Sequence, residues 1–179
     1  CVIKTNEGTH GSGVFLAHTE QQARQLVYKM LERGLRPLVQ EYIRESHGQD
    51  IRAFVVGGKV VASMRRKAKG SEFRYNFHLG GEVEKLAISD EYAEIACKAA
   101  EILGLEIAGV DMLESDRGPL VLEVNSSPGL EGIEAASGVN VASRIISNLV
   151  SLHKSWQEAE EKQQISDSQS DNEEAKGNA

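Results

Sequence analysis

Short apolar runs separated by turn residues occur in two pairs along the chain, and this pattern predicts β-hairpins. In the first pair, residues 48–66 hold two runs rich in valine and alanine on either side of Gly57 and Gly58. A pair of glycines between such runs is typical of a tight two-residue turn. In the second pair, residues 108–113 and 118–125 flank a polar turn at 116–118. We therefore expect four strands in two hairpins.

Three shorter strands and four helices complete the predicted pattern. Strands are expected at 2–4, 14–17 and 37–43. Apolar residues three or four positions apart predict helices over 19–34, 89–104, 130–136 and 139–152. Thr19 and Gln22 form a capping box at the start of the first helix, and Ser89 caps the second. Because strands and helices alternate without the regular spacing of βαβ units, the expected fold class is α+β with two β-rich subdomains.

Charge divides the chain into a nearly neutral body and an acidic tail. The 179 residues have a formal net charge of −7, and residues 157–179 hold seven acidic residues against Lys162 and Lys176. This tail has no aromatic residue and one isolated branched apolar residue, Ile165. That is too little apolar surface to offset the conformational entropy lost on ordering. We expect a globular domain over 1–156 and a disordered acidic tail over 157–179.

Composition excludes several classes of protein. Apolar residues make up 40% of the chain and charged residues 26%, which is ordinary for a globular protein. No apolar run approaches the length of a membrane-spanning helix and no signal-peptide pattern opens the chain, so we expect a cytoplasmic protein without membrane contact. Cys1 and Cys97 match no metal or redox spacing. Because the chain begins without methionine and inside an apolar run, we also expect it to be a piece of a longer protein.

Three oxygen-bearing side chains are predicted to meet in the second hairpin. Successive side chains of a strand point to opposite faces, so Glu123 and Asn125 share one face while Val124 points to the other. The hairpin would set Asp111 beside Glu123. Two carboxylates and an amide oxygen suit Mg²⁺, which keeps several waters and shares its shell with nucleotide phosphates. The alternative is that these residues form the wet face of a half-buried hairpin.

A glycine-rich loop and a basic cluster offer two sites for phosphate. Gly8, Gly11 and Gly13 lie between the first two predicted strands, where backbone N–H groups could fold over phosphate oxygens. The loop lacks the Lys-Ser/Thr ending of a phosphate-loop NTPase. Five cations gather within ten residues: Arg65, Arg66, Lys67, Lys69 and Arg74. This basic cluster attracts phosphate or an acidic partner, unless it is a solvated loop.

The segments D-M-L at 111–113 and L-E-V-N-S-S-P-G-L at 122–130 resemble the metal-binding end of the ATP-grasp carboxylate–amine ligases. Within that superfamily the chain most resembles the RimK type, the ribosomal-protein glutamate ligases, over roughly residues 1–153. The resemblance implies an ATP-grasp fold in which two α+β subdomains grip ATP. They would span about 1–43, the lid side, and about 44–156, the metal side. Ligases of this kind carry a further N-terminal domain upstream, which we expect to be missing here.

The resemblance also assigns roles to individual residues. It implies that ATP is bound by Lys4, Gly11, Gly13, Glu41, Tyr42, Asp50 and Arg74. It implies catalytic roles for Arg74, Asn76 and His78. It implies that the metal, Mg²⁺ at two sites with Mn²⁺ as a substitute, is held by Asp111, Glu123 and Asn125. Taken alone, a lysine such as Lys4 or an acid such as Asp50 is more often an ordinary strand or surface residue, and Glu41 and Tyr42 could be an ordinary strand end.

The implied activity is ATP-dependent amide-bond formation through an acyl phosphate. The favoured substrates are L-glutamate, or a related amino acid, and the C-terminal carboxylate of a ribosomal protein, another protein or a peptide. The alternatives are a small-molecule ligase, making a glutamyl dipeptide or a lysine-biosynthesis carrier conjugate, and an inactive nucleotide-binding module. The sequence holds no Ser-His-Asp or Cys-His constellation, which fits catalysis by positioning and electrostatics. We expect no direct DNA binding, and an assembly of identical chains stays open.

Overall fold

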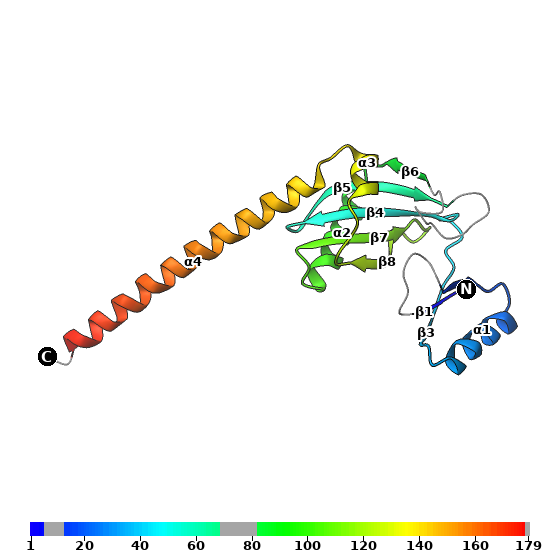
Figure 1. Ribbon diagram of the computed structural model, residues 1–179, viewed down its shortest axis with the longest axis horizontal. Coiled ribbons are helices and arrows are strands. Elements are labelled where there is room, and N and C mark those ends of the chain that lie inside the picture. Colours follow the sequence, from blue (N-terminus) through cyan, green and yellow to red (C-terminus); the bar gives the residue numbers. More distant parts are fainter. Residues whose placement is uncertain (6–12, 69–81, 178–179) are drawn as a thin grey trace. The chain divides into compact units, whose positions relative to one another are not determined.

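The structure is a computed structural model that describes residues 1–5, 13–68 and 82–177, with the side chains of the last helix described up to residue 163 (Figure 1). The chain forms two compact units, Cys1–Val139 and Asn140–Ala179. The first unit contains two separate sheets, and the second is one long helix.

The smaller sheet has three antiparallel strands in the order β2-β1-β3. Its strands are β1 (Val2–Thr5), β2 (Val14–Leu16) and β3 (Pro37–Gln40), and α1 (Glu20–Glu32) packs against it. Ile3, Ala17 and Met30 form the buried core between the helix and the sheet. Because neighbouring residues of a strand point to opposite faces, the side chain of Lys4 belongs to the face away from α1.

The ends of α1 follow the sequence prediction. The hydroxyl of Thr19 accepts a hydrogen bond of 3.2 Å from the backbone N–H of Gln22. The side chain of Gln22 reaches back, and its Oε1 accepts a hydrogen bond of 2.9 Å from the backbone N–H of His18. The helix ends before Gly34, whose φ of +72° is a left-handed conformation that favours glycine. The start of the second helix differs from the prediction. Ser89 is at the N-cap position, but its side chain makes no capping hydrogen bond.

The larger sheet has five antiparallel strands in the order β6-β5-β4-β7-β8. Its strands are β4 (Gln49–Val56), β5 (Lys59–Lys67), β6 (Glu82–Lys85), β7 (Ile107–Leu113) and β8 (Leu120–Asn125). The pairs β4–β5 and β7–β8 are the two predicted hairpins, and both are confirmed. The strand β6 was not anticipated.

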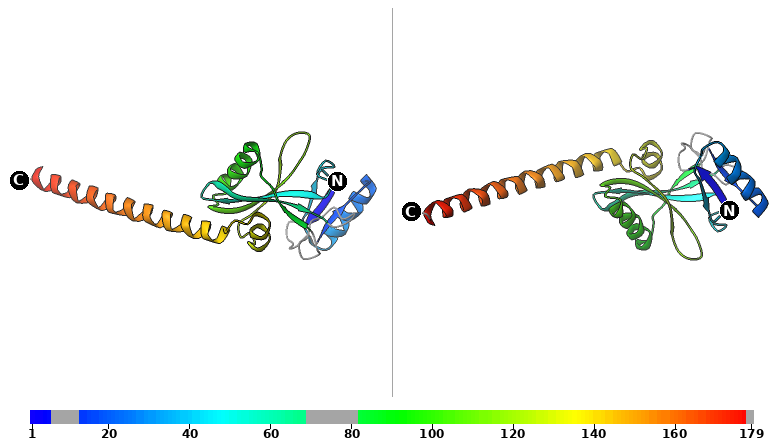
Figure 2. Two further views of the ribbon diagram at one scale, coloured as in Figure 1. Left: turned by 90° about the horizontal axis from the view of Figure 1, so that it is seen from above. Right: turned by 90° about the horizontal axis from the view of Figure 1, so that it is seen from below.

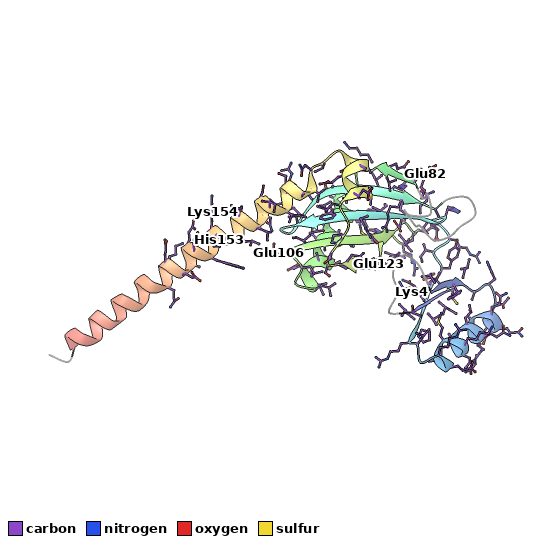
Figure 3. All side chains as sticks on the ribbon, in the orientation of Figure 1. Lys4, Glu82, Glu106, Glu123, His153 and Lys154 are labelled. Atoms are coloured by element: carbon purple, nitrogen blue, oxygen red, sulfur yellow. The ribbon has the colours of Figure 1, made fainter. Side chains whose placement is uncertain are left out.

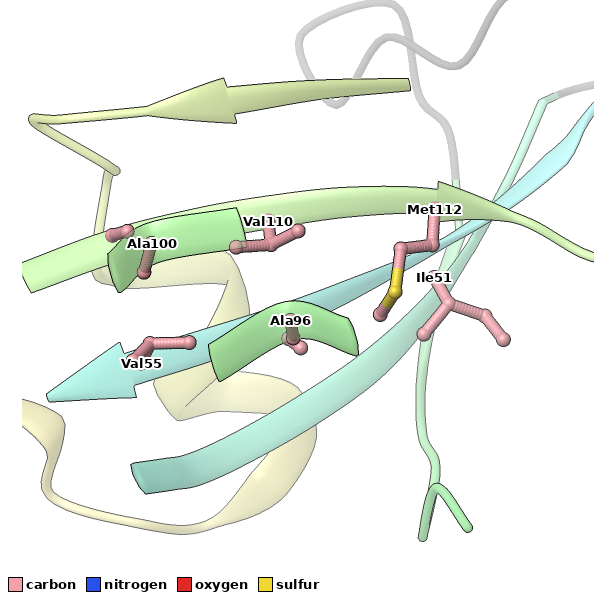
Figure 4. Close-up of a cluster of buried hydrophobic side chains, with 8 residues drawn as sticks. Ile51, Val55, Ala96, Ala100, Val110 and Met112 are labelled. Carbon is pink, nitrogen blue, oxygen red and sulfur yellow. The ribbon is translucent and has the colours of Figure 1, made fainter. Parts of the chain in front are cut away.

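A hydrophobic core lies on one face of the larger sheet. The helix α2 (Asp90–Ile102) lies on this face, where Ala96 and Ala100 contact the strands (Figure 4). Alanine side chains are small, so the helix backbone approaches the sheet closely. The sheet contributes mainly Ile51, Val55, Val110 and Met112 to the contact. Burying each of these larger side chains stabilises the fold by about 1.5–3 kcal/mol.

A shorter helix lies on the opposite face. It is α3 (Glu131–Ser137), which contacts β5 and β6, and Figure 2 shows α2 and α3 on opposite sides of the sheet. A Cβ built on Gly132 would lie 3.8 Å from the Cε of Met64, so α3 rests on the Met64 side of the sheet. Because α3 has only seven residues, it covers part of that face.

The second unit is a helix longer than the one expected over 139–152. The helix α4 runs from Val141 to Gly177. The described side chains of its later part, residues 157–163, are exposed, and the disorder expected for 157–179 stays a prediction. The composition argument left out local propensity, since the stretch from 158 to 164 consists of Glu, Ala, Lys and Gln, which are strong helix formers. None of the described helices is long and apolar enough to cross a membrane.

Candidate functional site

A β-bulge brings the predicted metal residues onto one face of the larger sheet. Near the turn, Met112 pairs with Val121, but Asp111 pairs with Glu123, so Leu122 is an extra residue in β8. Without this shift, Glu123 would pair with Val110 and point into the core beneath α2. A one-residue change of register exchanges the two faces of a strand. The bulge therefore puts Glu123 on the face that carries Asp111.

Glu123 and Asn125 are neighbours on this face. The amide Nδ2 of Asn125 donates to Oε1 of Glu123 at 3.2 Å and to the backbone oxygen of Gly109 at 3.4 Å. Glu123 is exposed and Asn125 is half-buried. Figure 3 labels Glu123 on its strand, with the side chains of the neighbouring elements around it. Two oxygen-bearing groups thus stand together at the edge of the sheet, as the sequence predicted.

Gly109 leaves space for the turn that follows β8. A Cβ built on Gly109 would lie 2.7 Å from the Cβ of Pro128 and 3.6 Å from Nε of Arg52. Carbon atoms do not approach this closely, so only glycine fits at position 109. The segment from Asn125 to Pro128 therefore packs directly on the backbone of β7, which fixes where Asn125 stands.

Asp111 is buried and held by two arginines that the sequence argument did not connect with it. Arg52 lies opposite Asp111 on β4, and its Nε and Nη2 donate to Oδ1 and Oδ2 at 2.6 and 2.7 Å. Arg66 of β5 adds a third contact, from Nη2 to Oδ2 at 2.7 Å. The side chain of Asp111 is only 2% exposed. Strand alternation could have placed Arg52 on this face, because it is two residues from Asp50, which was singled out.

The cluster extends to Asp50, the residue expected to bind ribose. Arg66 donates through Nε and Nη2 to both oxygens of Asp50, the second at 2.8 Å. Two carboxylates and two guanidinium groups therefore form one network of four residues, defined here as the Asp50–Arg66–Asp111–Arg52 cluster. Bidentate contacts of this kind fix geometry as well as supplying energy.

The two carboxylates of the cluster differ in acidity. Burial alone would raise the pKa of Asp111, but the hydrogen bonds and charges of Arg52 and Arg66 outweigh it and hold that pKa below its ordinary value. Burial also raises the pKa of Asp50, and there Arg66 offsets only part of the effect. Burial would lower the pKa of Arg66, but Asp111 and Asp50 raise it. At neutral pH Asp111 is a fixed negative charge between two fixed positive ones.

The donor set suits a hard divalent cation in its chemistry, because carboxylate and amide oxygens are the ligands that Mg²⁺ prefers. The arrangement is not yet that of a metal site. Asn125 turns its nitrogen toward Glu123, and Asp111 is engaged by Arg52 and Arg66. Among the described residues, no three His, Cys, Asp or Glu side chains group as a metal site. A metal ion bound here would need the amide oxygen of Asn125 as a ligand. Asp111 would also have to change its contacts with Arg52 or Arg66.

The basic cluster expected from the sequence is divided between the two faces of the sheet. Arg66 joins Asp111 on one face. Arg65 is on the other, where its Nη2 donates to Glu114 at 3.0 and 2.9 Å. Lys67 pairs with Glu84 at 2.8 Å. The described part of this segment is therefore neither one concentrated patch nor a solvated loop.

The remaining predicted residues fall into two groups. Glu41 follows β3, is exposed and accepts a hydrogen bond of 2.7 Å from Nη2 of Arg117, while Tyr42 is half-buried. Lys4 is half-buried on β1 and is labelled in Figure 3. Gly13 has a φ of +81°, and a Cβ there would lie 3.0 Å from Oγ1 of Thr5. Six of the residues singled out in the sequence lie outside the described residues: Gly8, Gly11, Lys69, Arg74, Asn76 and His78.

Comparison with known proteins decides the family. The chain matches the RimK-like ATP-grasp domain over residues 1–149. It belongs to the RimK-like ATP-grasp family. The expected α+β ATP-grasp fold is thereby confirmed, and the RimK-like assignment rests on most of the chain rather than on the D-M-L and L-E-V-N motifs alone.

The RimK-like chain is similar in sequence to two probable alpha-L-glutamate ligases. A probable alpha-L-glutamate ligase of Aeromonas salmonicida (strain A449) is 56% identical over 145 residues, which cover 81% of this chain and 49% of that protein. Another, of Thioalkalivibrio sulfidiphilus (strain HL-EbGR7), is 52% identical over 148 residues, which cover 82% of this chain and 48% of that protein. The RimK-like chain therefore spans about half the length of the curated relatives it matches.

The solved structures share the fold. D-cycloserine synthetase DcsG superimposes with a TM-score of 0.65 at 19% identity, covering 83% of this chain and 54% of that one. The ATP-grasp ligase PsnB, complexed with a phosphomimetic variant of its minimal precursor, Mg and ADP, gives a TM-score of 0.61 at 24% identity, covering 84% and 45%. At these identities the likeness shows the fold alone.

Proposed function

We propose that this chain is the ATP-grasp part of an ATP-dependent ligase that adds L-glutamate, or a related amino acid, to the C-terminal carboxylate of a protein or peptide. The observation that carries the proposal is the shared face of Asp111, Glu123 and Asn125 in a chain of the RimK-like family. The names of the relatives, probable alpha-L-glutamate ligases, supply the amino acid. A ribosomal-protein C-terminus is the acceptor that the family resemblance suggests.

Each group of predicted residues has a role in this proposal. Lys4 and Arg74 hold the phosphates of ATP, and the loop containing Gly11 and Gly13 closes over them. Glu41, Tyr42 and Asp50 bind the adenosine part. The family resemblance gives Asn76 and His78 catalytic roles, together with Arg74. The metal, Mg²⁺ or Mn²⁺ at two sites, would be held by Asp111, Glu123 and Asn125, where it neutralises charge on the phosphates.

The proposed reaction has two steps. The acceptor carboxylate attacks the γ-phosphorus of ATP, so an acyl phosphate forms and ADP leaves. The amine of glutamate then attacks the carbonyl carbon, inorganic phosphate leaves, and the amine loses a proton as the amide forms. A carboxylate must be activated in this way because oxide is a poor leaving group. The protein contributes positioning and electrostatic stabilisation, and no enzyme nucleophile is required.

Mass spectrometry tests the proposal directly. The chain is incubated with Mg-ATP, glutamate and peptides that end in a carboxylate, and we expect peptide products heavier by one or more glutamyl residues. The matched control is the same peptide with an amidated C-terminus, which offers no carboxylate and should stay unmodified. ATP turnover with a small-molecule product but no modified peptide would favour a small-molecule ligase. Nucleotide binding without any product would favour an inactive nucleotide-binding module.

A further inference from the structure

The Asp50–Arg66–Asp111–Arg52 cluster is balanced in charge, with two carboxylates and two guanidinium groups. Three N–H groups donate to Asp111 at 2.6 to 2.7 Å. An ionised carboxylate has about four lone-pair positions, so most of those of Asp111 are in use. A divalent cation on Asp111 would compete for these positions and add two positive charges to a neutral, largely buried cluster.

Of the two arginines in the cluster, Arg52 can move away from Asp111 with the smaller loss of contacts. Arg66 is divided between Asp50 and Asp111, so moving it would take hydrogen bonds from both acids at once. Both hydrogen bonds of Arg52 go to Asp111 alone. The side chain of Arg52 is 15% exposed against 10% for Arg66, so it is nearer solvent. If Arg52 moves, Arg66 still neutralises Asp111.

We infer that Arg52 is a positioning residue that holds Asp111 as its resident counter-ion, so that Asp111 accepts a divalent metal only when an anion arrives with it. A metal ion alone would have to displace a guanidinium and leave that guanidinium without an anion. A metal–nucleotide complex brings phosphate charge that offsets both changes. This inference rests on the proposed function, because it takes Asp111 and Glu123 as metal ligands. It adds that metal and nucleotide bind as a coupled pair.

The test measures Mn²⁺ affinity of the chain by electron paramagnetic resonance, without nucleotide and with a non-hydrolysable ATP analogue. For the unaltered chain we expect weak Mn²⁺ binding alone and tighter, Glu123-dependent binding with the analogue. Arg52→Met removes the competing guanidinium and keeps an unbranched side chain in place of the aliphatic part of arginine. It should tighten Mn²⁺ binding without nucleotide on the order of fivefold or more, the lower end of common couplings between linked sites. Adding Glu123→Ala should reverse the gain.

Arg65→Met is the matched control, because Arg65 is also a strand arginine bound to a carboxylate but lies on the opposite face of the sheet. It should leave Mn²⁺ affinity unchanged. Melting temperatures check that each variant folds. If Arg52→Met does not fold, Arg52→Lys serves instead, since lysine keeps the charge but loses the two-pronged contact. It should give a smaller gain in Mn²⁺ affinity.

The outcomes separate the inference from the proposed function. If the analogue promotes Glu123-dependent Mn²⁺ binding but neither Arg52 variant changes the affinity for Mn²⁺ alone, the inference is wrong and the metal assignment survives. If the analogue promotes no Glu123-dependent binding, the metal assignment is wrong and the inference falls with it. An equal gain in Arg65→Met would also overturn the inference, because the effect would then be one of overall charge.

Discussion

Gly109 and Pro128 touch across the end of the β7–β8 hairpin, with no room between them for a side chain on residue 109. This contact joins the backbone of β7 to the turn that follows Asn125. The same face of β7 carries Asp111 two residues further on. The position of Asn125 relative to Asp111 therefore depends on residue 109 being a glycine, which has no side chain.

Gly109→Ala should destabilise the chain by about 1–3 kcal/mol, the usual range for forcing an extra carbon into a packed site. Relief by movement of the 125–128 turn would displace Asn125, so turnover should fall as well. Chemical denaturation and the glutamyl-transfer assay measure the two effects. Gly129→Ala is the matched control, because a Cβ at 129 meets nothing within 4 Å. Equal stability of both variants would contradict the packing argument.

Glu123→Ala should abolish turnover and leave the fold intact. Glu123 is exposed, so its removal creates no cavity, and its loss takes away one of the two proposed carboxylate ligands. Activity and melting temperature are measured together. Glu94→Ala, an exposed glutamate of α2 on the other face of the sheet, should change neither. Near-normal activity of Glu123→Ala would show that the metal assignment is wrong.

Asp111→Asn should be destabilising at neutral pH by about 3–5 kcal/mol, because it removes the anion from between two buried guanidinium groups. The folded chain lowers the pKa of Asp111, so its ionised form contributes stability above about pH 3.9, the ordinary value of an aspartate. That contribution is lost as the pH falls through the lower, folded pKa.

The difference in free energy of unfolding between the unaltered chain and Asp111→Asn should therefore be constant near neutral pH. It should become smaller below about pH 3.9. Urea unfolding at a series of pH values measures it. The control is Asp116→Asn, in the exposed turn of the same hairpin, which should show no such narrowing. A difference that stays constant to the lowest pH would mean that Asp111 is not held ionised by the arginines.

Deleting Gln157–Ala179 should lower the helical signal in circular dichroism, because α4 continues to Gly177. The melting temperature of the rest should change little, since residues 157–163 are exposed and contribute no buried surface. An unchanged helical signal would favour the disorder that composition suggested. A large fall in melting temperature would show that this part of α4 packs against another surface.

Local patterns carried the fold prediction. The two glycines at 57 and 58, the capping pair Thr19 and Gln22, and the apolar runs that became β4 and β7 were all visible in the sequence, because each signal acts over a few residues. The long helix was missed because net charge and a lack of branched apolar residues were weighed above the propensity of Glu, Ala and Gln.

The candidate site was only partly visible for a different reason. The shared face of Glu123 and Asn125 follows from a spacing of two, but the contact of Arg52 with Asp111 joins residues 59 positions apart. No local pattern states which strands are neighbours, so the pairing of β4 with β7 had to come from the structure. The close packing of Pro128 on Gly109 was hidden for the same reason.

The extra residue Leu122 separates the β7–β8 hairpin into two parts with different freedom to vary in length. Residues between Leu113 and Leu120 form the turn, where an insertion can bulge outward while the pairing behind it stays in register. Beyond Leu122 there is no such tolerance. Loss of Val124, for example, would place Asn125 opposite Val110 and aim its side chain at α2, away from Asp111, whereas loss of Leu122 itself would remove the bulge and leave Glu123 opposite Asp111. Length variation in related chains should therefore be confined to the turn and to Leu122, and the count from Glu123 to Asn125 should stay fixed.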